Sequence, residues 1–236
     1  MPDALSADRR IEAGDLRPGT LDVPASFRLR MVALGFMPVL HLAATALPLA
    51  LALTGRARPG VAWLAPMILF LAPPLVVRLT TTWTPLATGL VQPGSAAFLH
   101  WWFTAQLQIV FTRFPALEEM LRMVPGLYSL WLRLWGARIG ALVYWSPGVV
   151  ILDRSLVRIG SRVIVGAAAR LNPHVLAPVE GRNMGLYLAP ITIGDDVVIG
   201  ASSQLLPGCE IAPGEVTPPF RSIHAFSRFA GGRRRS

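Results

Sequence analysis

The sequence contains no lysine, since all 22 basic residues are arginine. A P-loop nucleotide site needs a lysine on the phosphates, and a Schiff-base enzyme needs a lysine amine. The single cysteine, Cys209, excludes an intrachain disulfide, and no group of cysteines and histidines has the spacing of a zinc site. These four features are therefore excluded before any motif is considered.

Charge is also scarce. Charged residues make up 15% of the chain, whereas ordinary globular domains have about 25%. No formal charge lies between Arg30 and Arg56, and none lies between Arg58 and Arg78. Together with a hydrophobic fraction of 53% and a mean hydropathy of +0.51, this pattern indicates a lipid bilayer.

The net charge of +9 does not indicate a nucleic-acid partner. The arginines are scattered or flank apolar segments, and they form no stripe interleaved with aromatic side chains. Anionic lipid headgroups are the counter-surface that we expect.

Two apolar runs follow a polar arm at residues 1–30. Met31–Leu53 is 23 residues long, and about 20 apolar residues span the hydrocarbon core. After a turn, Val61–Val77 adds 17 more. We predict a transmembrane helical hairpin over 31–78, kinked at Pro73-Pro74; two buried helices of a soluble core are the alternative. The arm carries five arginines and the turn two, which favours an inner-membrane protein with its catalytic domain facing the cytoplasm.

Residues 79–136 combine aromatic and leucine-rich faces with charged positions. Pro115 and Pro125 divide this stretch into short segments, and Glu118, Glu119 and Arg122 lie between apolar residues at helical spacing. The pattern predicts amphipathic helices lying in the membrane interface. Packing of the same helices on the following domain is an alternative that is compatible with it.

From residue 137 to 219 the apolar period becomes six. Ile159-Gly160 and Val165-Gly166 are six residues apart, as are Ile193-Gly194 and Ile199-Gly200. Ile151, Val157 and Val163 keep the same step in a register shifted by two. This period is typical of a parallel β-helix, in which each unit supplies a short strand and a corner. We expect a basic tail at 220–236.

The repeat resembles the left-handed β-helix acyltransferases of the hexapeptide-repeat superfamily. The run Ile191–Gly208 looks like their I-x-I-G-D-x-x-x-I-G…P-G stretch, and Gly136–Gly140 (G-A-R-I-G) is similar to members associated with membranes and linked to exopolysaccharides or peptide synthetases. The resemblance implies a left-handed parallel β-helix, a homotrimer, and an acyl thioester donor such as acetyl-CoA bound between subunits. It implies no metal.

Acyl transfer needs a base for the acceptor's proton and hydrogen-bond donors for the oxyanion. Of the four histidines, His41 and His100 lie in apolar segments and His224 lies in the expected tail. His174 stands where a repeat strand gives way to a long loop, as the family's catalytic histidine does. It is our candidate base.

Further site residues follow from the loop and from the resemblance. Glu180 is placed to orient the imidazole or to bind the acceptor, and Arg182 to hold a phosphate or carboxylate. The favoured alternative for both is a solvated loop. Asn172 shares a strand face with His174 and is placed to donate to the acyl carbonyl, with a corner role as the alternative. The resemblance assigns Asp153 a role in positioning the acceptor or the histidine, and a structural turn residue is the alternative. The backbone N–H groups of Gly200 and Ala201 are expected to line a donor-binding wall on a neighbouring subunit. The predicted catalytic residues are His174, Glu180, Asn172 and Asp153, and the predicted binding residues are Arg182, Gly200 and Ala201.

The sequence leaves other functions open. An acyl-carrier-protein-dependent lipid or polyketide acyltransferase fits the same residues, and a non-catalytic membrane-anchored scaffold would need no base. A γ-type carbonic anhydrase is rejected, because it needs three histidines around zinc and residues 137–219 contain only His174. The predicted function is acyl transfer, chiefly acetyl transfer from a CoA thioester to a hydroxyl of a membrane-associated, glycan or lipid acceptor, with an amine acceptor as the alternative.

Overall fold

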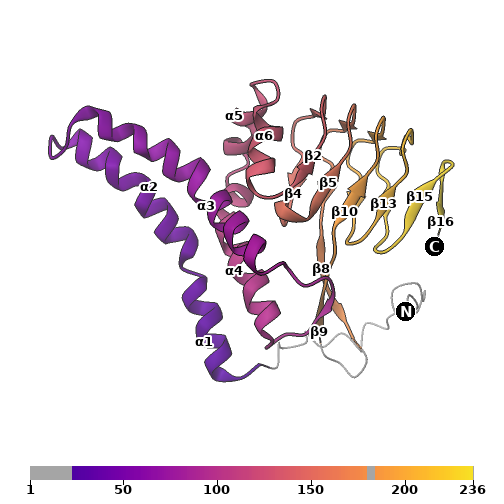
Figure 1. Ribbon diagram of the computed structural model, residues 1–236, viewed down its shortest axis with the longest axis horizontal. Helices are drawn as coiled ribbons and strands as arrows, with labels where there is room; N and C mark the ends of the chain where they lie inside the picture. Colours follow the sequence, from indigo (N-terminus) through magenta and orange to yellow (C-terminus); the bar gives the residue numbers. More distant parts are fainter. Residues whose placement is uncertain (1–22, 180–183, 236) are drawn as a thin grey trace.

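The computed structural model describes residues 23–179 and 184–235, which form a helical half and a stack of short strands (Figure 1). In the helical half an antiparallel pair of long helices projects away from the strands. The helical segments before residue 84 are α1 (Ala25–Leu34), α2 (Met37–Leu53), the 3₁₀ turn η1 (Pro59–Trp63) and α3 (Leu64–Trp83).

The two apolar segments are longer than the hydropathy pattern predicts. Helix α1 begins at Ala25, inside the stretch expected to be an irregular arm, and α3 continues to Trp83. Ala25–Leu53 and Pro59–Trp83 are long and apolar enough to cross a membrane, and only 11% and 22% of their most apolar windows are buried within the protein. Pro73 and Pro74 lie inside α3 as expected.

Three further helices cover the first turn of the strand stack. Ser95 caps the longest of them, because its hydroxyl accepts from the backbone N–H of Phe98 at 3.1 Å. Phe111, Trp131 and Trp135 are buried in one hydrophobic cluster with Ile139 of the first strand. The helices therefore pack on the strand stack, as the alternative interpretation held; they are α4 (Ala96–Arg113), α5 (Ala116–Arg122) and α6 (Leu127–Leu134).

The charged positions of α5 do not form the solvated face that the amphipathic pattern predicts. Glu118 is buried, and so is the side chain of Arg122. Glu118 accepts from the hydroxyl of Tyr128 at 2.6 Å and from Arg122 at 3.0 Å. Because a buried charge is tolerated only when it is paired and hydrogen-bonded, the charges that mark an amphipathic helix in the sequence are instead an internal network.

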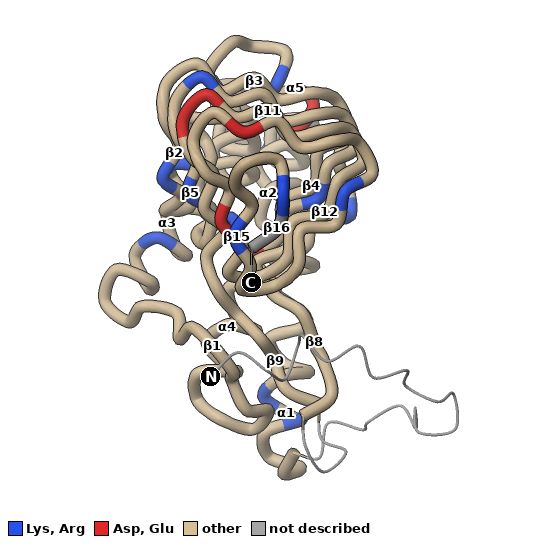
Figure 2. The backbone as a smooth tube through the Cα atoms, turned by 90° about the vertical axis from the view of Figure 1, so that its right-hand side faces the viewer, with Lys and Arg blue, Asp and Glu red and all other residues tan. Residues whose placement is uncertain are grey.

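The strands make three sheets that the chain visits in turn, parallel in all pairs except that of β15 with β16. We call them the coil stack (138–235). Figure 2 looks along the stack from its C-terminal end, and successive turns of the chain lie over one another. One sheet has the order β16-β15-β13-β10-β5-β2, the second β11-β6-β3 and the third β14-β12-β7-β4. Their bounds are β2 (Arg138–Ile139), β3 (Tyr144–Trp145), β4 (Val150–Ile151), β5 (Val157–Ile159), β6 (Ile164–Val165), β7 (Arg170–Leu171), β10 (Ile191–Ile193), β11 (Val198–Ile199), β12 (Gln204–Leu205), β13 (Glu210–Ile211), β14 (Ser222–Ile223), β15 (Arg228–Ala230) and β16 (Arg233–Arg235).

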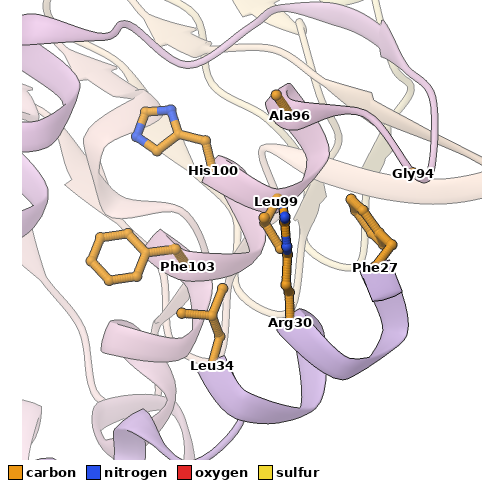
Figure 3. A pocket seen from close by; sticks show the side chains of 8 residues that line it. All are labelled: Phe27, Arg30, Leu34, Gly94, Ala96, Leu99, His100 and Phe103. Carbon is orange, nitrogen blue, oxygen red and sulfur yellow. The ribbon is translucent and has the colours of Figure 1, made fainter. Parts of the chain in front are cut away.

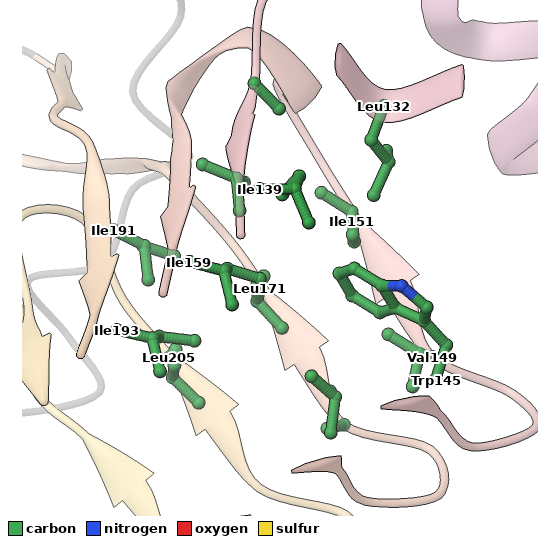
Figure 4. Packing of buried hydrophobic residues seen from close by; sticks show 14 of the residues in the cluster. Leu132, Ile139, Trp145, Val149, Ile151, Ile159, Leu171, Ile191, Ile193 and Leu205 are labelled. Atoms are coloured by element: carbon green, nitrogen blue, oxygen red, sulfur yellow. The ribbon is translucent and has the colours of Figure 1, made fainter. Parts of the chain in front are cut away.

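The six-residue period arises from side chains that point into this stack. Ile159, Leu171, Ile193 and Leu205 are buried in its centre (Figure 4). The positions two residues earlier also point inward and hold small or branched side chains such as those of Val157, Ala169 and Cys209. Glycine follows the strands because the next coil is close: a Cβ on Gly160 would lie 2.7 Å from the backbone nitrogen of Asp195.

The coils are not all of one length, and both exceptions occur at one corner. Glu210 pairs with Thr192, 18 positions earlier, and Arg158 with Arg138, 20 positions earlier. Thr192 pairs with Arg158 across 34 positions. Relative to the 18-residue coil, the first therefore has two extra residues and the second has 16. Both insertions separate a strand of the β4–β7 sheet from one of the β2–β5 sheet, so they share one corner, which we call the site corner.

The two-residue insertion explains the shifted register in the sequence. Ile151 points inward as the last strand position of the first coil, whereas Val157 and Val163 occupy the earlier inward positions of the second coil. The 16-residue insertion is a hairpin of β8 (His174–Pro178) and β9 (Met184–Leu188), and β9 also pairs with β1 (Gly89–Val91) from the helical half.

The segment 220–236 is not the basic tail that the sequence suggests. Ile223 and Phe229 are buried, and β14 and β15 pair in parallel with β12 and β13. The stack therefore extends through residue 230 and is closed by β16, which runs antiparallel to β15. His224, exposed as expected, belongs to this last coil.

Candidate active site

The two insertions at the site corner bring Asp153 and His174 into contact. Asp153 lies in the two-residue insertion before the short 3₁₀ turn η2 (Arg154–Leu156), and His174 is the first residue of β8. Nδ1 of His174 is hydrogen-bonded to Oδ2 of Asp153, one coil away. Both residues are among the predicted catalytic set, and the structure pairs them directly.

The carboxylate of Asp153 is held on both sides. Its side chain is only 1% exposed, and its Oδ1 accepts a hydrogen bond of 2.9 Å from the indole N–H of Trp101 in α4. Its backbone has a φ of 42° and a ψ of 61°, a left-handed conformation that aspartate tolerates better than most residues. The insertion thus turns the carboxylate toward β8.

One ring nitrogen of His174 is engaged by Asp153. Burial by itself would lower its pKa, but the charge of Asp153 and the hydrogen bond to it outweigh burial, and the pKa of His174 is raised. The side chain remains 23% exposed. Within residues 23–179 and 184–235 no group is hydrogen-bonded to Nε2. A carboxylate on Nδ1 favours the tautomer whose Nε2 lone pair can accept a proton.

The ring of Trp101 also lies against the imidazole. The two ring centroids are 4.9 Å apart with an interplanar angle of 69°, an edge-on arrangement. Trp101 belongs to a second hydrophobic cluster with Phe98 and with Leu186 and Leu188 of β9. The hairpin that carries His174 is therefore packed on the helix that contacts Asp153.

The other predicted site residues fall into three groups. Glu180 and Arg182 lie outside the described residues. Asn172 lies at the end of β7, two residues before His174, and its side-chain oxygen is buried with no hydrogen-bond partner among the described residues. That buried acceptor is compatible with a role at the site, but the structure assigns it none.

Gly200 and Ala201 occupy a different corner, between β11 and β12. The N–H of Gly200 donates to the Thr217 hydroxyl at 2.9 Å, and the carbonyl of Ala201 accepts from the N–H of Phe220 at 2.8 Å. The prediction of a donor wall of free backbone N–H groups is therefore wrong for Gly200, because the next coil uses that group.

Sequence reasoning missed the helical contribution to the site. Trp101 lies in the aromatic stretch expected at the membrane interface, and nothing in the sequence marks Trp101, Gln108 or Arg154 as neighbours of Asp153. The backbone N–H and Nη1 of Arg154 donate to Oε1 of Gln108 at 2.9 and 3.0 Å. The sequence offers one signal, the polar Gln108 within an apolar segment, but this signal does not reveal which residue Gln108 contacts.

Other chemically suggestive features lie away from the pair. Burial raises the pKa of the Cys209 thiol to about 12, which makes it a poor nucleophile. No group of three metal-ligating side chains occurs within the described ranges. An open, mostly apolar hollow of about 440 Å³ lies between α1 and α4 (Figure 3), lined by Phe27, Arg30, Leu34, Gly94, Ala96, Leu99, His100 and Phe103. It includes neither Asp153 nor His174.

Comparison with known proteins gives a partial match. The chain is 40% identical over 76 residues to "Nodulation protein L" of Rhizobium leguminosarum bv. viciae, and the match covers 30% of this chain and 38% of that protein. The chain thus spans well under half the length of this curated relative. No family model matches the sequence.

Similar solved structures are hexapeptide-repeat acetyltransferases. One from Vibrio cholerae, in complex with acetyl coenzyme A, is 17% identical with a TM-score of 0.40, over 56% of this chain and 87% of that one. A maltose O-acetyltransferase from Clostridium difficile 630 is 16% identical with a TM-score of 0.40, over 55% and 86%. Because both TM-scores are low, the evidence for the architecture of this chain is the strand pairing described above, and not these similarities.

Proposed function

We propose that the protein is an acyltransferase in which His174 is the general base. The observation that carries the proposal is the contact between Nδ1 of His174 and the buried carboxylate of Asp153. A carboxylate in this position fixes the imidazole's orientation and stabilises the imidazolium that forms when Nε2 takes a proton.

The proposed step is ester formation from a thioester. Nε2 of His174 takes the proton of an acceptor hydroxyl, whose oxygen attacks the thioester carbonyl carbon. The carbon–sulfur bond breaks, the sulfur leaves with the electron pair, and the imidazolium returns the proton to the thiolate. The products are an ester and a free thiol, so no metal or redox group is required.

Acetyl-CoA is the donor that we propose, and the acceptor is a membrane-associated glycan or lipid hydroxyl. The donor is supported by the similarity of Ile191–Gly208 to the repeat of the hexapeptide acyltransferases. The acceptor class is supported by the two exposed apolar helical segments, Ala25–Leu53 and Pro59–Trp83. A substrate that shares the bilayer would reach the site corner without leaving the membrane surface.

The proposal places the α2–α3 hairpin in the inner membrane and the coil stack at its cytoplasmic face. Large apolar side chains such as Leu53, Trp63 and Trp83 are exposed on these helices, and only a lipid or protein environment would cover them. It also includes the left-handed winding and the homotrimer that the family resemblance implies. Carbonate extraction should leave the chain in the membrane pellet, and light scattering in mild detergent should give three copies; release to the supernatant, or an active monomer, would refute the respective part.

The function is tested in a strain that lacks the gene. Untargeted mass spectrometry should find acylated lipids or glycans that depend on the chain, and an extract of the deletion strain then supplies unmodified acceptor for transfer from radiolabelled acetyl-CoA. Loss of a general base lowers the rate by about 10²–10⁴-fold. We expect His174→Ala and His174→Gln both to show this loss.

His224→Ala is the matched control, because His224 is an exposed histidine of the same coil stack. It should transfer label at the wild-type rate. A folded His174→Ala protein with wild-type activity would refute the proposed function. The same assay is run with longer acyl-CoA thioesters and with acylated acyl carrier protein. If one of these donors reacts faster than acetyl-CoA, it replaces acetyl-CoA as the proposed donor.

A further inference from the structure

Helix α4 presents a row of buried polar side chains to the site corner. Trp101, Thr104 and Gln108 are all buried, and their spacing of three and four places them on one face of the helix. The Thr104 hydroxyl donates to the Trp101 carbonyl at 2.8 Å, and the Gln108 amide donates to the Thr104 carbonyl at 3.1 Å. Buried polar groups on an otherwise apolar helix need partners, and the free ends of this row point to the turn at Asp153.

The first end of the row is the indole of Trp101. Its N–H reaches Oδ1 of Asp153 at 2.9 Å, while Oδ2 is taken by His174. The carboxylate of Asp153 is almost completely shielded from solvent. These two hydrogen bonds therefore determine its rotamer. A hydrogen bond from a fixed ring removes the rotational freedom that a carboxylate with one partner would keep.

The other end of the row is the amide oxygen of Gln108. It accepts from the backbone N–H of Arg154, the residue after Asp153, and from its guanidinium. The left-handed backbone at Asp153 is costly and persists only when the surroundings impose it. One helix therefore holds both the side chain and the backbone of the residue that orients His174.

We propose that Trp101 is a positioning residue for the Asp153–His174 pair, an inference that rests on the proposed function. Its N–H fixes the carboxylate in the rotamer that faces Nδ1 and shares the carboxylate's negative charge. The active site is then built jointly by the coil stack and by a helix of the other half. The coil stack by itself supplies Asp153 and His174, but the indole of Trp101 that aligns them comes from α4.

The test removes the N–H in two ways. Trp101→Phe removes it together with the five-membered ring and keeps a six-membered aromatic ring, whereas 3-benzothienylalanine at position 101 replaces the N–H by sulfur and keeps the full size of the ring system. The neighbouring Trp102→Phe is the matched control, since the Trp102 indole donates to the carbonyl of Met31 at 3.0 Å and lies outside the pair. All variants are made in the full-length chain in detergent.

Two readouts separate positioning from a general loss of stability. A hydrogen bond to a charged group changes an equilibrium or rate constant by about ten- to a hundredfold. The kcat for label transfer should therefore fall by about that factor, while KM for acetyl-CoA stays near the wild-type value. By NMR titration, the pKa of His174 should rise further, because Asp153 no longer shares its charge with the indole. Trp102→Phe should change neither quantity.

The outcomes distinguish this inference from the function on which it rests. If both position-101 variants keep wild-type kcat and the wild-type His174 pKa while His174→Ala is inactive, the positioning role is wrong and the acyltransferase stands. If His174→Ala is active, the function itself falls. Should Trp101→Phe fail to fold, the benzothienyl variant decides the same question, because it changes one atom of the ring.

Discussion

Replacing Arg154 by methionine should lower stability far more than the same replacement at Arg162. Both arginines make two contacts to a carboxylate from another part of the chain, and their surroundings differ. The Arg154 side chain is 1% exposed, with Nε at 3.1 Å from Oε1 of Glu118 and Nη2 also bonded to that oxygen. Arg162 contacts Asp196 at 2.6 and 2.7 Å, but these side chains are 57% and 53% exposed.

The magnitude follows from what each replacement leaves behind. Removing Arg154 leaves Oε1 of Glu118 buried without its cation, and breaking one side of a buried pair costs about 3–5 kcal/mol. Glu118 keeps Arg122 and Tyr128 on its other oxygen, which places the expected loss in the lower part of that range. For a chain of this length each kcal/mol lowers Tm by about 2–4 °C, so a fall of roughly 6–12 °C is expected.

Thermal unfolding followed by circular dichroism, in one detergent for all variants, measures the difference. Arg162→Met should unfold at the wild-type temperature, because water and salt screen an exposed pair. Adding Glu118→Gln to Arg154→Met removes the orphaned charge and should recover part of the lost Tm. Equal Tm values for the two single variants, or a further fall in the double variant, would refute the argument from buried charge.

Three further predictions concern the Asp153–His174 pair and the coil contacts. A base must be neutral and the pKa of His174 is raised, so the acid limb of the pH–rate profile should lie above pH 6.5. In Asp153→Asn only burial still acts on the imidazole, and burial lowers its pKa. An acid limb that does not move to lower pH in this variant would contradict the assignment. The same raised pKa gives stability that is complete below pH 6.5 and is lost as pH rises through the folded pKa, which a Tm series against pH measures. Gly160→Ala should lower Tm, because its Cβ would lie 2.7 Å from the backbone of the next coil. Gly60→Ala is the control and should leave Tm unchanged, because its Cβ would have no neighbour within 4 Å. Equal Tm values for the two variants would show that the coils can separate without cost.

The strand stack was predictable because its signal is local. Each inward side chain recurs six residues later whatever the rest of the chain does, so Ile193, Ile199 and Leu205 reveal the coil by themselves. The last coil is hidden in the sequence because the position six residues after Ile211 holds the polar Thr217, followed by Pro218-Pro219. Phe229 nevertheless fills the same inward position as Ile211.

The charged helix face was misread for a different reason. Glu118 and Arg122 alternate with apolar residues, as they would on a helix at a membrane surface. Periodicity reports which residues share a face, and it does not report what that face meets. In the structure the face meets Tyr128 and Arg154, and the charges are buried in pairs.

The sequence by itself determined the repeat, the apolar segments and the identity of the one histidine beside a long insertion. These are properties of spacing and composition, and they survive any arrangement of the parts. The tertiary structure alone decided what His174 contacts. Asp153 lies 21 positions before it and Trp101 lies 52 positions before Asp153. They meet because two insertions of different length share one corner of stacked coils, and because α4 packs there with its polar row turned toward the carboxylate.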